Sequence, residues 1–191
     1  MSIFVYVGIG VAVFLLLLFF ASYVKTSPQI AYIISGLSKT PKVLIGTGGF
    51  RIPFLQQLDK IYTGQITVDI KTTTPVPTSD FINVDVDAVA KVRVKPTEDG
   101  IRLASANFLN MNPHQISEQV KDVLQGNMRE IVGTLDLRAL NTDRDGFSNQ
   151  IQLKAAKDMD ALGIEILSCN IQSVTDREGL IEALGADNTC K

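Results

Sequence analysis

The segment Asn141–Gln152 is the part of this chain that most resembles a ligand-binding motif. Oxygen-bearing side chains stand at its first, third, fifth and ninth positions, and Gly146 stands at the sixth, as in a calcium-binding loop. Such a loop begins with Asp and ends with a bidentate Glu, whereas here these positions hold Asn141 and Gln152. The missing charges favour a polar turn between two helices, which caps the second helix. The sequence therefore predicts no calcium binding at micromolar concentrations.

The only histidine, His114, stands directly after Pro113, at the expected start of a helix. Because no second histidine is present to share a metal ion, a surface position is favoured over a ligating or catalytic one. The glycine-rich segment Gly46–Arg51 lacks both G-x-G-x-x-G and the Gly-Lys-Ser/Thr ending of a phosphate-binding loop. Its glycines are interpreted as turn residues or as points of close approach.

Two carboxylates, Asp85 and Asp87, lie two residues apart on the polar face of a strongly alternating strand. Paired carboxylates can perform acid–base chemistry, but on a sheet they are more often solvated or paired with cations such as Lys91 and Arg93. The chain also lacks a G-x-S-x-G nucleophile elbow. The sequence thus predicts no catalytic, cofactor-binding or metal-binding residues, and a protein that is not an enzyme.

The charge balance and the cysteines exclude further classes. The 191 residues carry 18 basic and 20 acidic side chains, without a basic stripe that has aromatic residues interleaved, so nucleic acid is not an expected partner. Cys169 and Cys190 form neither a metal-binding spacing nor a disulfide framework. They favour reduced thiols in a cytosolic compartment.

The N-terminal segment Ile3–Val24 carries no charge, and as a helix it would reach about 33 Å, enough to cross a hydrocarbon core of about 30 Å. A cleaved signal peptide is disfavoured, because no Lys or Arg precedes the segment and no A-x-A-like site follows it. Lys25, Lys39 and Lys42 follow the segment, so we expect a single-pass membrane anchor with the body facing the cytoplasm.

The body begins with strand patterns and continues with helix patterns. Apolar residues alternate in Gln65–Lys71 and again in Ile82–Val94, across a Thr/Pro-rich connector at Thr72–Asp80, which predicts antiparallel strands with one wet face. Asn112 and Pro113 then mark the start of a helix with an apolar stripe that ends at Ile131. The remaining expected elements are helices at Glu98–Phe108 and about Arg144–Leu162, a strand at Ile164–Val174, and a last helix from Asp176 to Leu184. This order predicts an α+β fold.

Several segments together resemble the SPFH domain of the stomatin, prohibitin, flotillin and HflK/C superfamily, and most of all bacterial flotillins. They are the anchor, Gly48–Phe54, the strand pair joined by the Thr/Pro-rich connector, and Val120–Leu184 with its Leu124–Thr134, Asn141–Phe147, Gly163–Leu167 and Glu182–Ala186 stretches. The resemblance implies an SPFH head in two subdomains, assembly into large rings or cages, and organisation of membrane microdomains rather than catalysis. It also implies a coiled coil after Asp176 and brings no catalytic or cofactor-binding residues.

On this basis four regions are expected: an anchor at 1–24, a mainly β subdomain at 25–95, an α/β subdomain at 96–176, and the start of a C-terminal helix at 177–191. The expected function is that of a membrane-anchored scaffold protomer, with membrane lipids, copies of itself and client membrane proteins as partners. The alternative is a regulatory adaptor that holds a membrane protease or another membrane enzyme. The two differ in the size of the detergent-extracted particle and in whether a hydrolase co-purifies.

A second membrane contact is predicted shortly after the anchor. Five apolar residues are nearly consecutive there, so a strand could bury only alternate ones against its own core; they are Phe50, Ile52, Pro53, Phe54 and Leu55. Arg51 and Lys60 are near enough in sequence to reach anionic headgroups. A neighbouring protomer or subdomain that covers the same face is the alternative.

Overall fold

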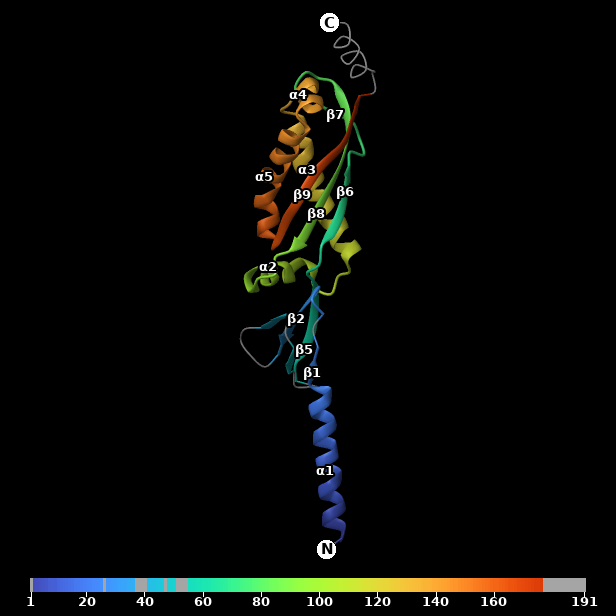
Figure 1. Ribbon diagram of the computed structural model, residues 1–191, viewed down its shortest axis with the longest axis vertical. Coiled ribbons are helices and arrows are strands. Elements are labelled where there is room, and N and C mark those ends of the chain that lie inside the picture. Colours follow the sequence, from blue (N-terminus) through green and yellow to red (C-terminus); the bar gives the residue numbers. More distant parts are fainter. Residues whose placement is uncertain (1, 26, 37–40, 47, 51–54, 177–191) are drawn as a thin grey trace.

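The computed structural model describes residues 2–25, 27–36, 41–46, 48–50 and 55–176. Figure 1 shows an elongated molecule with α1 at one end, a small group of strands next to it, and a larger body of strands and helices beyond. The N-terminal elements are α1 (Ser2–Ala21), β1 (Tyr23–Val24), β2 (Ile30–Ser35), β3 (Lys42–Ile45), β4 (Gly49–Phe50) and β5 (Gln57–Tyr62). The larger body holds β6 (Ile66–Lys71), β7 (Val76–Pro77), β8 (Asn83–Val94), α2 (Glu98–Phe108), α3 (Pro113–Val132), α4 (Leu137–Thr142), α5 (Arg144–Ala161) and β9 (Ile164–Asp176).

The helix α1 has 20 residues and extends away from the rest of the molecule (Figure 1). Large apolar side chains are exposed along the helix from Phe4 to Phe20, and each of them has between 52 % and 84 % of its surface accessible to solvent. Ser22 directly follows the helix, and both its amide (3.0 Å) and its hydroxyl (2.7 Å) donate to the carbonyl of Leu18. Among the described residues, no helix combines the length and the apolarity that crossing a membrane requires.

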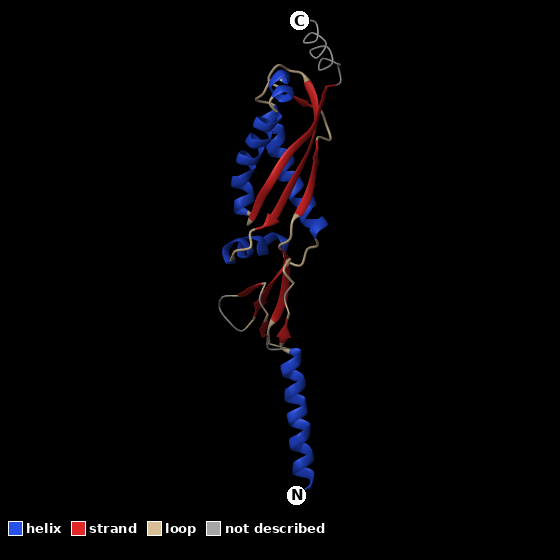
Figure 2. Ribbon diagram, viewed as in Figure 1, coloured by secondary structure: helices blue, strands red, loops and turns tan. Residues whose placement is uncertain are grey.

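Two small antiparallel sheets follow α1 in Figure 2. The first pairs β1 with β4, and the second has the order β3-β2-β5. In the second sheet β2 is central, and its Ala31 and Ile33 join Ile61 of β5 in the hydrophobic core of the molecule. Ile30, Tyr32 and Ser35 of β2 are less buried, whereas Ile34 is buried like its neighbour Ile33.

The larger sheet is built on β8, which pairs with β6 and β7 along one side and with β9 along the other. All of these pairings are antiparallel. Along β8 every second residue from Val84 to Val94 is buried, and the residues between them are partly or fully exposed. The antiparallel sheet with one wet face is therefore confirmed. Two bulges shift the register with β9, one at Asp87/Ala88 and one at Lys91/Val92.

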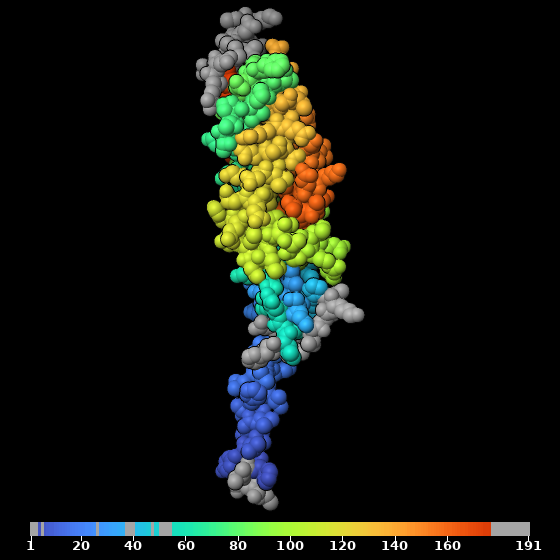
Figure 3. All heavy atoms as spheres, turned by 180° about the vertical axis from the view of Figure 1, so that it is seen from behind, coloured from blue at the N-terminus to red at the C-terminus, as the bar shows by residue number. Residues whose placement is uncertain are grey.

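The helices α3 and α5 lie on the buried face of this sheet, where α3 packs on β6 and α5 packs on β9. Figure 3, the view from behind, shows α3 in yellow and α5 in orange along the body. Four apolar residues of α3 at helical spacing are fully buried, namely Ile116, Val120, Leu124 and Met128. Four residues of α5 at the same spacing are also buried, namely Phe147, Ile151, Ala155 and Met159. The helices expected at Glu98–Phe108, from Pro113 and at about Arg144–Leu162 are thus confirmed, as is the returning strand β9, and the fold is α+β. The last expected helix, from Asp176 to Leu184, lies outside the described residues except for Asp176, which ends β9.

Phe81, in the turn between β7 and β8, combines a left-handed backbone (φ 62°) with a side chain that is 89 % exposed. The turn is held by Thr78, whose hydroxyl binds Asp80 and accepts from the amide of Ile82 at 3.1 Å. Asp80 also accepts from the amide of Leu137 at 3.4 Å. The hydrogen bond from Thr78 lowers the pKa of the Asp80 carboxyl. The turn therefore imposes a conformation that a bulky side chain rarely adopts.

Replacing Phe81 with Asn is expected to raise the free energy of unfolding by about 0.5–1 kcal/mol, because Asn tolerates the left-handed region better than a bulky residue does. Thermal unfolding of the two chains measures the difference. As a matched control, Leu153→Asn changes another highly exposed side chain within α5, whose backbone is helical. A loss of stability in Phe81→Asn would show that the ring makes contacts that outweigh the strain.

Candidate functional site

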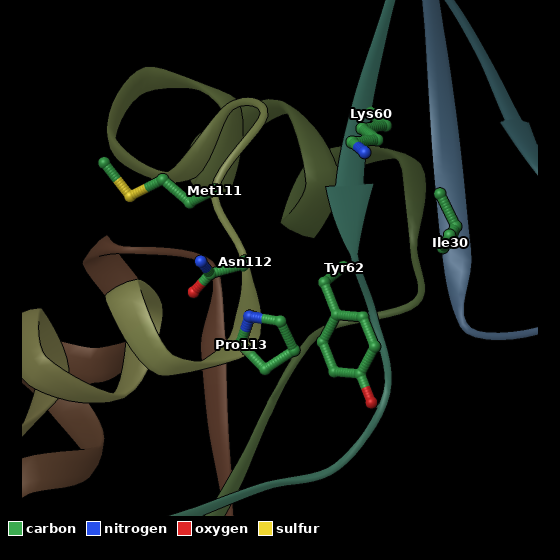
Figure 4. Close-up of a pocket in the computed structure, with 6 residues that line it drawn as sticks. All are labelled: Ile30, Lys60, Tyr62, Met111, Asn112 and Pro113. Atoms are coloured by element: carbon green, nitrogen blue, oxygen red, sulfur yellow. The ribbon is translucent and has the colours of Figure 1, made fainter.

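A pocket of about 170 Å³ lies where β2 and β5 meet the connection between α2 and α3. Figure 4 shows the ring of Tyr62 facing Pro113 beside it, with Lys60 on the same strand as Tyr62. The lining residues are Ile30, Lys60, Tyr62, Met111, Asn112 and Pro113. Lys60 is the only charged member of this lining, so the pocket offers one ammonium group, one phenol and an otherwise mainly apolar wall.

Asn110 holds one side of this pocket in place. Its backbone is left-handed (φ 59°), and its amide donates to the carbonyl of Lys60 at 2.8 Å. Its side-chain oxygen accepts from the amide of Lys60 at 3.0 Å, and its side-chain nitrogen donates to the buried carboxylate of Asp59 at 2.8 Å. Asn110 thus joins the edge of the small sheet to the connection before α3. No sequence pattern predicted this role, and the asparagines before Pro113 are the only local signal of it.

The residues singled out in the sequence do not come together into a site. Asp85 and Asp87 lie on the wet face of β8, and Arg93 forms an ion pair with Glu165 of β9 rather than with either of them. His114 lies exposed in the first turn of α3, as expected. Within the described ranges, no group of three or more His, Cys, Asp or Glu side chains is placed to hold a metal ion.

The structure describes one of the two cysteines. Cys169 is a buried free thiol in β9, and burial raises the pKa of this thiol. A thiol with a raised pKa is a poor nucleophile, because the thiolate is the reactive form. Cys190 lies outside the described residues.

The calcium-like segment is almost entirely helical. Asn141 belongs to α4, Asp143 alone separates α4 from α5, and the rest of the segment belongs to α5. The Asp143 carboxylate accepts from the amide of Gly146 at 2.9 Å and so caps α5. The polar turn with an N-cap is confirmed, and a helical backbone cannot wrap around an ion as a calcium loop does.

We accordingly expect no calcium binding at micromolar concentrations, since Asp143 serves the helix and the terminal acidic ligands are absent. Asp143→Ala is expected to lower the free energy of unfolding by about 1 kcal/mol through loss of the cap. Calorimetric titration with calcium, together with thermal unfolding of both chains, tests the two statements. A micromolar isotherm that disappears in Asp143→Ala would contradict the first.

The structure describes only the two ends of the predicted second membrane contact. Ile52, Pro53 and Phe54 lie outside the described residues, and of Phe50 the structure describes the backbone, which pairs with Tyr23 of β1. Leu55 is 60 % exposed. In the glycine-rich segment, Gly49 is a point of close approach, because a Cβ there would lie 2.5 Å from the end of the Leu44 side chain. The membrane contact itself stays a prediction.

The sequence profile of the SPFH domain / Band 7 family matches residues 24–190. Among similar proteins, the flotillin-like protein FloT of Bacillus subtilis is 27 % identical over 193 residues, which cover 93 % of this chain and 38 % of FloT. Human flotillin-2 is 33 % identical over 131 residues, 66 % of this chain and 31 % of the relative. Flotillin-1 of Drosophila melanogaster is 28 % identical over 171 residues, 88 % of this chain and 40 % of the relative.

The chain therefore spans well under half the length of these relatives. The matched region takes in both small sheets, the pocket and the larger body, so the family assignment rests on the whole head and not on one motif. This chain belongs to the SPFH domain / Band 7 family.

Proposed function

We propose that this chain is a membrane-held scaffold protomer, which assembles with copies of itself into large rings or cages that organise lipids and proteins into microdomains. The observation that carries the proposal is the family match over residues 24–190, next to an N-terminal segment without charges. The likeness to flotillins supports the scaffold role.

In this proposal the segment Ile3–Val24 inserts into the bilayer as a single pass, with the body on the cytoplasmic side. Its support is the run of apolar side chains exposed around α1, which water solvates poorly. The lysines that follow, among them Lys25 and Lys42, support the orientation. Reaction of Lys42→Cys with an impermeant thiol reagent in intact cells would contradict it.

The head in this proposal has two subdomains, followed by a C-terminal helix that begins a coiled coil. The expected division into 25–95 and 96–176 needs a correction, because β6, β7 and β8 share one sheet with β9. The alternative function is that of an adaptor holding a membrane protease or another membrane enzyme. Extraction in mild detergent, followed by sizing and identification of the co-purifying proteins, separates the two. A very large particle of this chain alone supports the scaffold, whereas a stoichiometric hydrolase supports the adaptor.

A fluorescent label on Leu55→Cys is expected to be quenched by lipids that carry a quencher near the headgroups, if the segment from Phe50 to Leu55 contacts the membrane. Leu55 suits the label because it is exposed and follows the apolar run. The measurement uses the full chain in liposomes, with Cys169 and Cys190 replaced by Ala. A label on exposed Asn149→Cys of α5 provides the control. Equal quenching at both sites would reject the contact and favour a protomer interface.

A further inference from the structure

One row of polar side chains on α3 lies along the outer edge of β6. Ser117 Oγ donates to the carbonyl of Thr67 at 3.3 Å, and Gln125 Nε2 donates to the carbonyl of Lys71 at 2.8 Å. Ser117 and Gln125 are eight residues apart, so they lie on the same face of the helix. We call them the α3 row. The row binds two backbone carbonyls of a strand whose one recorded neighbour in the sheet is β8.

A second row, on α5, lies along the outer edge of β9 in the same way. Its members are four residues apart along the helix, and each binds a backbone group of β9. The contacts run from Arg144 Nη1 to the carbonyl of Gln172 (3.4 Å), from the amide of Ile171 to Ser148 Oγ (3.3 Å), and from Gln152 Nε2 to the carbonyl of Ile166 (3.4 Å). We call Arg144, Ser148 and Gln152 the α5 row.

The carbonyls bound by the α3 row are those that a further strand would use. The amide of Thr72 donates to the carbonyl of Val86 at 3.1 Å. The backbone groups of the even-numbered residues of β6 therefore point toward β8. Backbone groups alternate in direction along a strand, and Thr67 and Lys71 therefore face away from β8. We infer that the α3 and α5 rows close both edges of the larger sheet against strand pairing with another copy of this chain.

The consequence concerns copies held side by side on one membrane, and so it rests on the proposed function. Both β6 and β9 are antiparallel to β8, so they run in the same direction. The β6 edge of one copy against the β9 edge of the next would form a parallel, head-to-tail pair, which repeats from copy to copy and grows as an open chain unless the rotation between copies closes it into a ring. Unpaired edges are templates for such growth. Closed edges leave other surfaces of the head to form a finite assembly.

Disulfide crosslinking between two tagged full-length forms tests this inference, with both forms expressed together and an oxidant added to the isolated membranes. One form carries Asp69→Cys and the other Asn170→Cys, because both residues stand opposite Val89 in the middle of their edge strands. Cys169 and Cys190 are replaced by Ala in both forms. A second pair of forms, which we call the uncapped pair, also has side chains of the two rows replaced. Its first form carries Asp69→Cys with Ser117→Ala and Gln125→Ala, and its second form carries Asn170→Cys with Ser148→Ala and Gln152→Ala. The first form thus loses both contacts of the α3 row, and the second form loses two of the three contacts of the α5 row and keeps that of Arg144.

We expect crosslinking between the tags to rise several-fold in the uncapped pair and to stay at background when the rows are intact. As a matched control, Asn149→Ala with Gln150→Ala changes exposed polar residues of α5 and should leave the background unchanged. Circular dichroism of the purified forms verifies folding, and single substitutions at Gln125 and Gln152 replace the pairs if folding fails. Unchanged crosslinking in folded uncapped forms, or strong crosslinking with intact rows, overturns the inference. The same cell fractions show whether the chain is at the membrane, so failure of the proposed function is seen separately.

Discussion

In the proposed scaffold, where the segment Ile3–Val24 inserts into the bilayer, two arginines in the middle of α1 are expected to remove the chain from membranes. Val13 and Leu16 both lie on α1 with more than half of their surface exposed and are the proposed sites. Each arginine at the centre of an inserted helix costs about 2.5–3.5 kcal/mol, so Val13→Arg with Leu16→Arg costs about 5–7 kcal/mol of insertion free energy. Fractionation of cells expressing the double variant should find it in the soluble fraction.

The matched control for this experiment is Val13→Ala with Leu16→Ala, which shortens the same side chains without adding charge. It should remain with the membranes. The unfolding temperature of the head should be equal in both, because these side chains lie outside its core. A double-arginine chain that stays at the membrane, and resists extraction as the parent does, would show that another part of the head provides the attachment.

The second large effect is expected at Gly163, in the turn from α5 into β9. Its backbone is left-handed (φ 72°), and a Cβ there would lie 2.2 Å from the carbonyl oxygen of Gly100 and 2.8 Å from the amide nitrogen of Ala104. Both are backbone atoms of α2, which cannot move aside as a flexible side chain can. Gly163→Ala should therefore lower the free energy of unfolding by about 3 kcal/mol or more, through strain and displacement of α2.

Gly126→Ala is the matched control, since no atom lies within 4 Å of a Cβ at this exposed position in α3. Alanine is a better helix former than glycine, so this variant should gain about 0.5–1 kcal/mol. Urea unfolding of the three chains measures both effects. If Gly163→Ala unfolds at the same urea concentration as the parent, the close packing of α2 against this turn is wrong.

The elements with strong local signals were predictable from the sequence. The helix Glu98–Phe108 has the expected bounds, and α3 begins at Pro113 behind its Asn112 cap, which forms both hydrogen bonds of a capping box. The alternation in Ile82–Val94 identified the central strand, β8, with a start that differs by one residue. In each case the signal lies within the element itself.

Features that depend on distant contacts were not predictable. The six-residue helix α4 is too short for a periodic pattern, and the apolar run of β2 does not reveal its partners. The pairing of Arg93 with Glu165 follows from the register between β8 and β9, which two bulges shift. The contact of Asn110 with Lys60 joins residues 50 positions apart, and no local pattern specifies it.

The mass of the particle that mild detergent extracts from membranes tests the central claim most directly. Electron microscopy and light scattering of the purified full chain should show closed rings or cages made of many copies, because the proposed scaffold acts only as an assembly. Membranes from cells that express the double-arginine chain should yield no such particles. A monodisperse monomer from the parent chain, folded and recovered from the membrane fraction, would contradict the account.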